Sequence, residues 1–177
     1  GEVKSGQIKL KNGRSIDTDL VIWTAGIKPL DILANLPSAS LTENKRIKVN
    51  EKLEVAGLPG VFAVGDNTEF LDPRIRKPVP ALAYIAAAQG KMAAKNIIRS
   101  LKAKKLISYD PFYGVWIAPV GGKYAVAHFA WKEINIKGFW GWIIREAVDF
   151  RYMLSILSVK KAISIMWQEI TLFTKND

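Results

Sequence analysis

Apolar and polar residues alternate in some segments of the chain and run together in others, and the two patterns predict different elements. Around Lys11-Asn12-Gly13 apolar and polar positions alternate, which indicates a hairpin closed by an Asn-Gly turn. Residues 20–23 and 61–64 are continuously apolar, as in strands that are buried on both faces of a sheet. Residues 27–56 predict irregular chain with a short helical turn. These patterns together predict a mixed α/β protein.

The segment 81–105 predicts a long helix. Alanine is abundant there, Pro80 suits a first helical turn, and lysines near the end complement the helix dipole. Two strands joined by Gly121-Gly122 and a third strand then predict a small antiparallel sheet. These three strands are expected at residues 114–120, 123–131 and 133–137.

The tail, residues 138–177, predicts amphipathic helices. Its longest uncharged run, residues 152–159, has eight residues, whereas a membrane-spanning helix needs about 20. We therefore predict two helices that lie in the plane of a membrane surface, with packing on a partner domain or a second subunit as the alternative. Apolar residues in the last helix share one face and are Val159, Ala162, Ile163, Met166, Trp167, Ile170 and Phe173.

Charge and composition narrow the possible partners. The net charge is +10, and most of it lies in the second half together with most of the tryptophans, which indicates an anionic partner surface. Because the basic residues are interleaved with Ile, Leu and Val, the pattern favours a membrane and predicts no nucleic-acid binding. The chain has no cysteine, which excludes disulfides and cysteine-based metal or redox centres. We predict no metal site and no catalytic side chain, since the single histidine, His128, lies in a strand pattern.

One short stretch carries candidate binding chemistry. Gly65-Asp66 follows the apolar run 61–64 directly, and α/β proteins hold ligands beyond the ends of such strands. Glycine lets the backbone approach a ligand, and a carboxylate accepts hydrogen bonds from hydroxyl groups. The chain contains neither G-x-G-x-x-G nor a P-loop, so it has no complete phosphate-binding loop of its own.

The stretch "VFAVGD", with "DLVIWTAG" upstream and "PALAYIAAAQGKMAAKNI" downstream, resembles the pyridine-nucleotide flavoprotein superfamily. The resemblance implies a partial FAD/NAD(P)-binding Rossmann-like fold, namely its C-terminal portion, with a small antiparallel sheet and amphipathic C-terminal helices. It divides the chain into the end of an NAD(P)-binding domain (1–26), the C-terminal half of an FAD-binding domain with its hairpin (27–137), and the helical tail (138–177).

The resemblance also implies site residues and the cofactors FAD and NAD(H). Gly65 and Asp66 correspond to the motif that holds a ribityl hydroxyl of FAD. Ala83 and Tyr84 fall at the start of the helix that faces the flavin ring. Gly26 ends the last strand of the NAD(P)-binding domain.

Within this superfamily, "GVWIAPVGGKYAVAHFAW" and "REAVDFRYMLSIL" are similar to type II NADH dehydrogenases. This similarity implies an FAD-dependent NADH:quinone oxidoreductase, peripheral to the cytoplasmic face of a membrane, with Tyr84, Gln89 and Arg145 on the quinone side. Tyr84 replaces a glutamine that is frequent in this group, whereas Gln89 is retained. The implied partners are quinone, the membrane surface and a homodimer mate.

In this family the glycine-rich cofactor loops precede the region that the chain resembles. We therefore expect the chain to be the C-terminal part of a longer enzyme, with an N-terminal remainder as a further partner, and to be inactive alone. One alternative is a sulfide:quinone oxidoreductase-like enzyme, whose cysteines this chain lacks. Another treats the isolated chain as a non-catalytic module for dimerisation and membrane docking.

Overall fold

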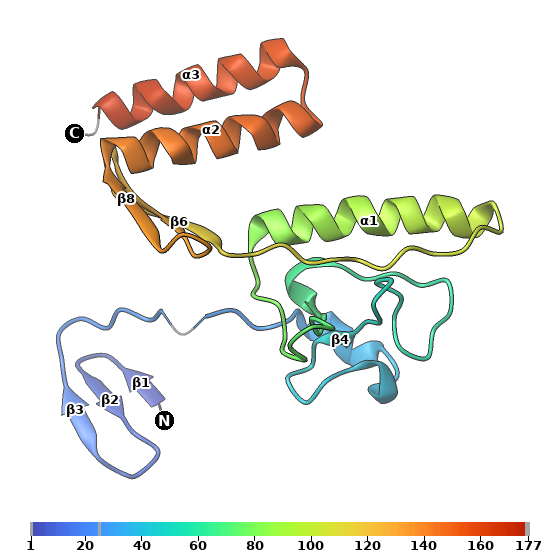
Figure 1. Ribbon diagram of the computed structural model, residues 1–177. Coiled ribbons are helices and arrows are strands. Elements are labelled where there is room, and N and C mark those ends of the chain that lie inside the picture. The colour runs from blue at the N-terminus through green and yellow to red at the C-terminus, as the bar shows by residue number, and fades with distance from the viewer. Residues whose placement is uncertain (1, 25, 176–177) are drawn as a thin grey trace. The chain divides into compact units, whose positions relative to one another are not determined.

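The computed structural model describes residues 2–24 and 26–175 and divides the chain into two compact units, residues 1–110 and 111–177 (Figure 1). The side chain of Phe173, part of the predicted apolar face of the tail, lies outside the described residues. The boundaries predicted after residues 26 and 137 stay predictions.

The first unit begins with a three-stranded antiparallel sheet of β1 (Glu2–Lys4), β2 (Gln7–Lys9) and β3 (Ser15–Asp17). Ile8 pairs with Ile16 in the register of β2 and β3. Gly13, in the turn between them, has a φ of +86°, which favours glycine. The predicted Asn-Gly hairpin is confirmed.

The two continuous apolar runs form no strands, so this part of the prediction is wrong. In the first, Leu20, Ile22 and Trp23 are 73%, 77% and 76% exposed, because no strand of the described residues lies beside them to complete a hydrogen-bond ladder. In the second, the only bridge among described residues joins Phe62 to Glu54. A continuous apolar run indicates burial. A strand forms, however, only where another strand lies beside it to pair with.

Helix α1 (Ala83–Leu101) covers the core of the first unit and confirms the predicted helix. The core consists of Leu53, Phe70, Ala93 and Tyr109, with the rings of Phe70 and Tyr109 edge to face at 5.2 Å between centroids. Nearby, β4 (Ile47–Lys48) and β5 (Thr68–Glu69) pair in parallel. The irregular segment before them contains the short 3₁₀ helix η1 (Asp31–Asn35), which confirms the predicted helical turn, and a second one, η2 (Ser38–Ser40), which the sequence did not predict.

A fully buried amide fastens α1 to the loops on either side. The Asn96 Nδ2 group donates hydrogen bonds to the carbonyls of Lys52 at 3.0 Å and Ile107 at 2.8 Å. Its Oδ1 atom accepts the N–H of Ile107 at 2.9 Å. Since all three contacts involve backbone groups, this one side chain fixes the position of α1 over its loops.

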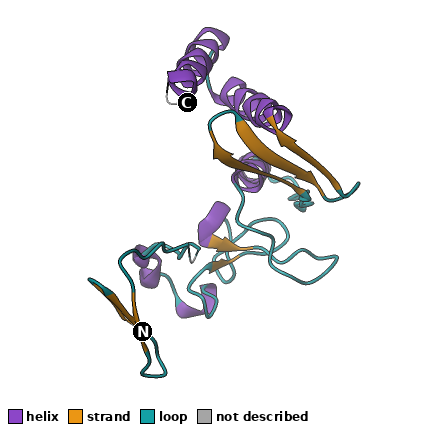
Figure 2. Ribbon diagram, turned by 90° about the vertical axis from the view of Figure 1, so that its left-hand side faces the viewer, coloured by secondary structure: helices purple, strands orange, loops and turns teal. Residues whose placement is uncertain are grey.

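The second unit is a three-stranded antiparallel sheet with a helical hairpin on one face. Strands β6 (Val115–Gly121), β7 (Tyr124–Phe129) and β8 (Ile134–Gly138) follow in order, and the turn between the first two contains Gly121-Gly122, as predicted. Helix α2 (Phe139–Ile156) lies along the sheet and α3 (Val159–Lys175) packs on α2 (Figure 2). The small buried residues Ala125 and Ala127 of β7 let α2 come close.

The predicted apolar face of α3 divides between two environments. Ala162 is fully buried, in the helix that packs against α2. Val159, Ile163 and Trp167, which recur every four residues, are exposed. Among the described residues no helix has both the length and the apolar character needed to cross a membrane.

Gly141 sets how closely α2 approaches the sheet. A Cβ atom at this position would lie 2.2 Å from the carbonyl oxygen of Ala125 and 2.9 Å from that of Ile136. Because both obstacles are backbone atoms, they cannot move aside as a flexible side chain would. We expect Gly141→Ala to lower the free energy of unfolding by at least about 1–3 kcal/mol, measured by urea unfolding followed by circular dichroism.

Gly90 provides the matched control. It lies within α1, and an added Cβ atom would meet nothing within 4 Å. Gly90→Ala should raise stability by about 0.8–1 kcal/mol, since alanine is the better helix former. Equal effects of the two substitutions would show that α2 does not pack as closely as described.

Candidate functional site

Gly65-Asp66 forms a tight turn at the end of the apolar run 61–64. The chain enters the 3₁₀ helix η3 (Gly65–Asn67) there, and Gly65 has a φ of +77°. A Cβ at Gly65 would lie 3.5 Å from the Cβ of Ala86, an ordinary contact. The left-handed backbone, rather than crowding, therefore requires glycine at this position.

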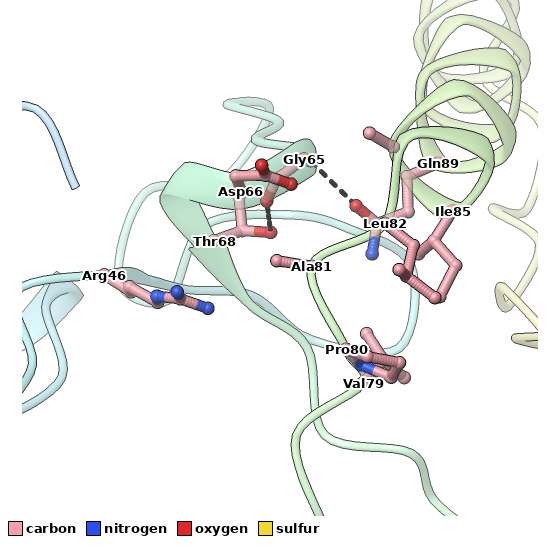
Figure 3. Close-up of a pocket in the computed structure, with 11 residues that line it drawn as sticks. Arg46, Gly65, Asp66, Thr68, Val79, Pro80, Ala81, Leu82, Ile85 and Gln89 are labelled. Atoms are coloured by element: carbon pink, nitrogen blue, oxygen red, sulfur yellow. Dashed lines mark hydrogen bonds between the residues drawn. The ribbon is translucent and has the colours of Figure 1, made fainter. Parts of the chain in front are cut away.

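Two side chains hold this turn in place. The backbone N–H of Gly65 donates a hydrogen bond to Oε1 of Gln89 at 2.8 Å, and the hydroxyl of Thr68 donates one to the Gly65 carbonyl at 2.8 Å. Figure 3 shows the Gln89 side chain reaching from α1 to the turn. Gln89 is only 2% exposed, so its amide serves the turn from inside the protein.

A shallow pocket opens beside the turn, at the first turns of α1 (Figure 3). The exposed carboxylate of Asp66 lies on one wall and the half-buried guanidinium of Arg46 on another. The cap position, Leu82, makes no side-chain cap, and no acidic residue lies in the first turn of α1. The remaining lining residues are Gly65, Thr68, Val79, Pro80, Ala81, Ile85, Ala86 and Gln89.

This arrangement suits a ligand that carries both hydroxyl groups and negative charge. The carboxylate accepts hydrogen bonds from hydroxyls, while Arg46 and the open N–H groups of α1 favour negative charge. A second opening, which shares Arg46, is lined by Lys28 and Asn44 among others. Among the described residues no group of three His, Asp or Glu side chains is placed to hold a metal.

The structure brings three of the predicted site residues together, Gly65, Asp66 and Gln89, whereas Ala83 and Tyr84 do not line the pocket. The pKa of buried Tyr109 is raised by burial and, to a smaller extent, by the charges of Tyr84 and Asp110. The cofactor and quinone roles of Ala83 and Tyr84 stay predictions.

Two further predicted residues lie elsewhere. Gly26 is exposed with a φ of +80°, and its role at the NAD(P) side stays a prediction. Arg145 belongs to the second unit, where it donates to Glu146 at 3.0 Å and lies 3.4 Å from Asp149. Its predicted quinone contact is likewise untested. His128 lies on β7 with its ring stacked on Trp116, and its Nδ1 is 2.9 Å from Asn135.

Sequence reasoning missed Arg46. It precedes the short strand β4 (Ile47–Lys48), where a basic residue is typical of a solvated strand end. No sequence motif or spacing links Arg46 to Gly65-Asp66. The two segments come together only through the parallel pairing of β4 with β5. Only the tertiary structure reveals this residue.

Comparison with known proteins identifies related chains. The family model described as "Pyridine nucleotide-disulphide oxidoreductase" matches residues 1–90. The apoptosis-inducing factor homolog A of Dictyostelium discoideum is 38% identical over 90 residues, which are 50% of this chain and 20% of that protein. The mitochondrial internal alternative NAD(P)H-ubiquinone oxidoreductase A1 of Arabidopsis thaliana is 25% identical over 187 residues, 97% of this chain and 36% of that protein.

The solved sulfide:quinone oxidoreductase of Aquifex aeolicus has a similar fold. Its TM-score is 0.64 at 17% identity, over 86% of this chain and 38% of that one. The likeness confirms the predicted FAD/NAD(P)-binding type of fold. The chain spans only about a third or less of the two curated relatives named above.

The buried amide of Gln89 offers a test of the site geometry. Gln89→Met removes the acceptor for the Gly65 N–H while keeping a side chain of similar length, and should lower the free energy of unfolding by about 1–3 kcal/mol. Gln168→Met is the control, because Gln168 is exposed on α3. Chemical unfolding of both variants measures the difference. Equal stabilities would contradict the assigned role of Gln89.

Proposed function

The chain belongs to the pyridine nucleotide-disulphide oxidoreductase family, and on this premise we propose that it is the C-terminal part of an FAD-dependent NADH:quinone oxidoreductase. The proposed overall reaction takes a hydride from NADH and delivers two electrons to a quinone. The observation that carries the proposal is the Gly65-Asp66 turn, fixed by Gln89 beside the first turns of α1.

The residues of the pocket fit FAD. The Asp66 carboxylate is exposed at the pocket wall, so it is available to accept a hydrogen bond from a ribityl hydroxyl. The uncapped start of α1 and the guanidinium of Arg46 stabilise negative charge on a bound group. FAD, when bound, supplies the redox chemistry, and the protein supplies position and electrostatics.

The choice of quinone as the electron acceptor is supported by the Arabidopsis relative, whose match extends over 97% of this chain, tail included. The second candidate, a sulfide:quinone oxidoreductase-like enzyme, is supported by the fold similarity at 17% identity. Sulfide chemistry would need thiols from outside this cysteine-free sequence. We therefore prefer the NADH:quinone reaction.

We further propose that the tail docks the enzyme on the cytoplasmic face of a membrane. The exposed stripe Val159, Ile163 and Trp167 is flanked by exposed Lys160 and Lys161. Apolar side chains beside lysines suit the boundary between acyl chains and anionic headgroups. A homodimer mate is the competing occupant of this stripe.

The cofactor assignment is tested in the full-length enzyme that contains this chain. Asp66→Ala should weaken FAD retention by about tenfold or more, because a charge-assisted hydrogen bond is lost. Asp31→Ala is the control, since Asp31 is exposed and pairs with neighbouring Lys28 on the surface. The flavin-to-protein absorbance ratio after gel filtration measures retention. An unchanged ratio in Asp66→Ala would remove Asp66 from the site.

The same absorbance measurement separates the enzyme from the non-catalytic module. The 177-residue chain alone should take up no added FAD, because it lacks a glycine-rich phosphate-binding loop. If the full-length protein also binds no flavin, the module interpretation replaces the enzymatic one.

Membrane docking is tested by charge reversal on α3. The double substitution Lys160→Glu and Lys161→Glu should weaken binding to vesicles of phosphatidylcholine with anionic phosphatidylserine by about tenfold or more. Lys91→Glu with Lys95→Glu, on the exposed side of α1, is the matched control. Co-sedimentation measures binding. Should the unaltered chain bind no vesicles and instead self-associate in ultracentrifugation, the stripe is a dimer interface.

A further inference from the structure

Among the described residues of the second unit, two polar groups are buried without a protein partner. Trp142 and Glu146 are 5% and 7% exposed and lie one turn apart on α2. Within the described part of the chain, neither Nε1 of Trp142 nor Oε2 of Glu146 has a hydrogen-bond partner. A buried polar group left unpaired costs free energy comparable to a lost hydrogen bond, so each of the two atoms calls for a partner.

The neighbouring side chains explain why Oε2 is left over. Arg145 donates its Nη1 group to Oε1 of Glu146 at 3.0 Å and places Nη2 3.4 Å from Asp149. From the β6–β7 turn, Lys123 lies 6.0 Å from the centroid of the Trp142 ring. Burial chiefly raises the pKa of Glu146, the charges of Asp149 and of Glu169 on α3 raise it further, and Arg145 opposes them.

The chemistry of the two unpaired atoms limits what can join them. An indole N–H only donates, and an ionised carboxylate oxygen only accepts. Side chains four residues apart on a helix are neighbours, so Trp142 and Glu146 lie on the same face of α2. A metal cation cannot accept from the indole, and an anion without a proton, such as chloride, cannot donate to the carboxylate. Only a molecule that both accepts and donates fits, and the depth of burial favours the smallest.

We propose that Trp142 and Glu146 bind one water molecule, which accepts a hydrogen bond from the indole N–H and donates one to Oε2. This water lies where α2 packs on the sheet and connects the carboxyl group of Glu146 to a neutral donor. Buried waters typically make about three hydrogen bonds to groups that would otherwise be unsatisfied. The proposal does not depend on which substrate the enzyme uses.

Nuclear magnetic resonance of the 177-residue chain with ¹⁵N-labelled tryptophan tests the proposal. Trp142→Phe assigns the indole resonance of Trp142, and Trp167→Phe assigns that of the exposed Trp167 as an internal reference. The Trp142 indole N–H should show a rotating-frame cross-peak to a long-lived water. It should also exchange with solvent about tenfold or more slowly than that of Trp167, because exchange needs local opening.

Glu146→Gln and Glu146→Leu identify the second partner of the water. Glu146→Leu should abolish the cross-peak, whereas Glu146→Gln, which keeps a polar group in place, should retain it with a shifted resonance. A shift in Glu146→Gln without any water cross-peak in the unaltered chain would mean a direct contact between the two side chains and overturn the proposal. Exchange as fast as that of Trp167 would overturn it too. If Glu146→Leu does not fold, the cross-peak of the unaltered chain still decides.

Discussion

The hydrogen bond from the Gly65 N–H to Gln89 is the constraint on which the candidate site depends. It joins the turn that ends the apolar run 61–64 to the second turn of α1. Gln89 is buried and has a backbone partner, so breaking this bond would leave the buried amide oxygen of Gln89 unpaired. The free-energy cost of breaking this bond therefore holds Asp66 and the start of α1 at the same pocket.

The same bond changes the interpretation of Gln89. The resemblance to type II NADH dehydrogenases places Gln89 on the quinone side, yet its Oε1 atom is 2.8 Å from a backbone N–H and almost inaccessible. In this structure the Gln89 side chain holds the turn, and its predicted contact with quinone stays a prediction. Arg46, which sequence patterns assign to a strand end, stands instead at the pocket wall.

Local chemistry accounts for what could be predicted from sequence. Asn12-Gly13 and Gly121-Gly122 specify turns through backbone conformations that few other residues adopt, and the alanines of α1 specify a helix through intrinsic propensity. The strand prediction for residues 20–23 and 61–64 was wrong because a strand forms only by hydrogen bonding to another segment of the chain. Their apolar side chains indicate burial, but the sequence of these runs does not identify the segment that would pair with them. Arg46 was missed for a similar reason, since the parallel pairing of β4 with β5 brings it to the site.

The family and the proposed substrate rest on different parts of the chain. The family model matches residues 1–90, within the first unit, and the Dictyostelium relative covers only half of the chain. The features that favour a membrane surface, namely the exposed stripe of α3 and its lysines, lie in the second unit. The Arabidopsis relative that supports quinone matches 97% of the chain and so includes this unit. The proposed flavin site lies in the first unit and by itself favours no particular electron acceptor. The choice of electron acceptor in the proposed function therefore depends on the similarity that extends into the second unit, which the family model does not cover.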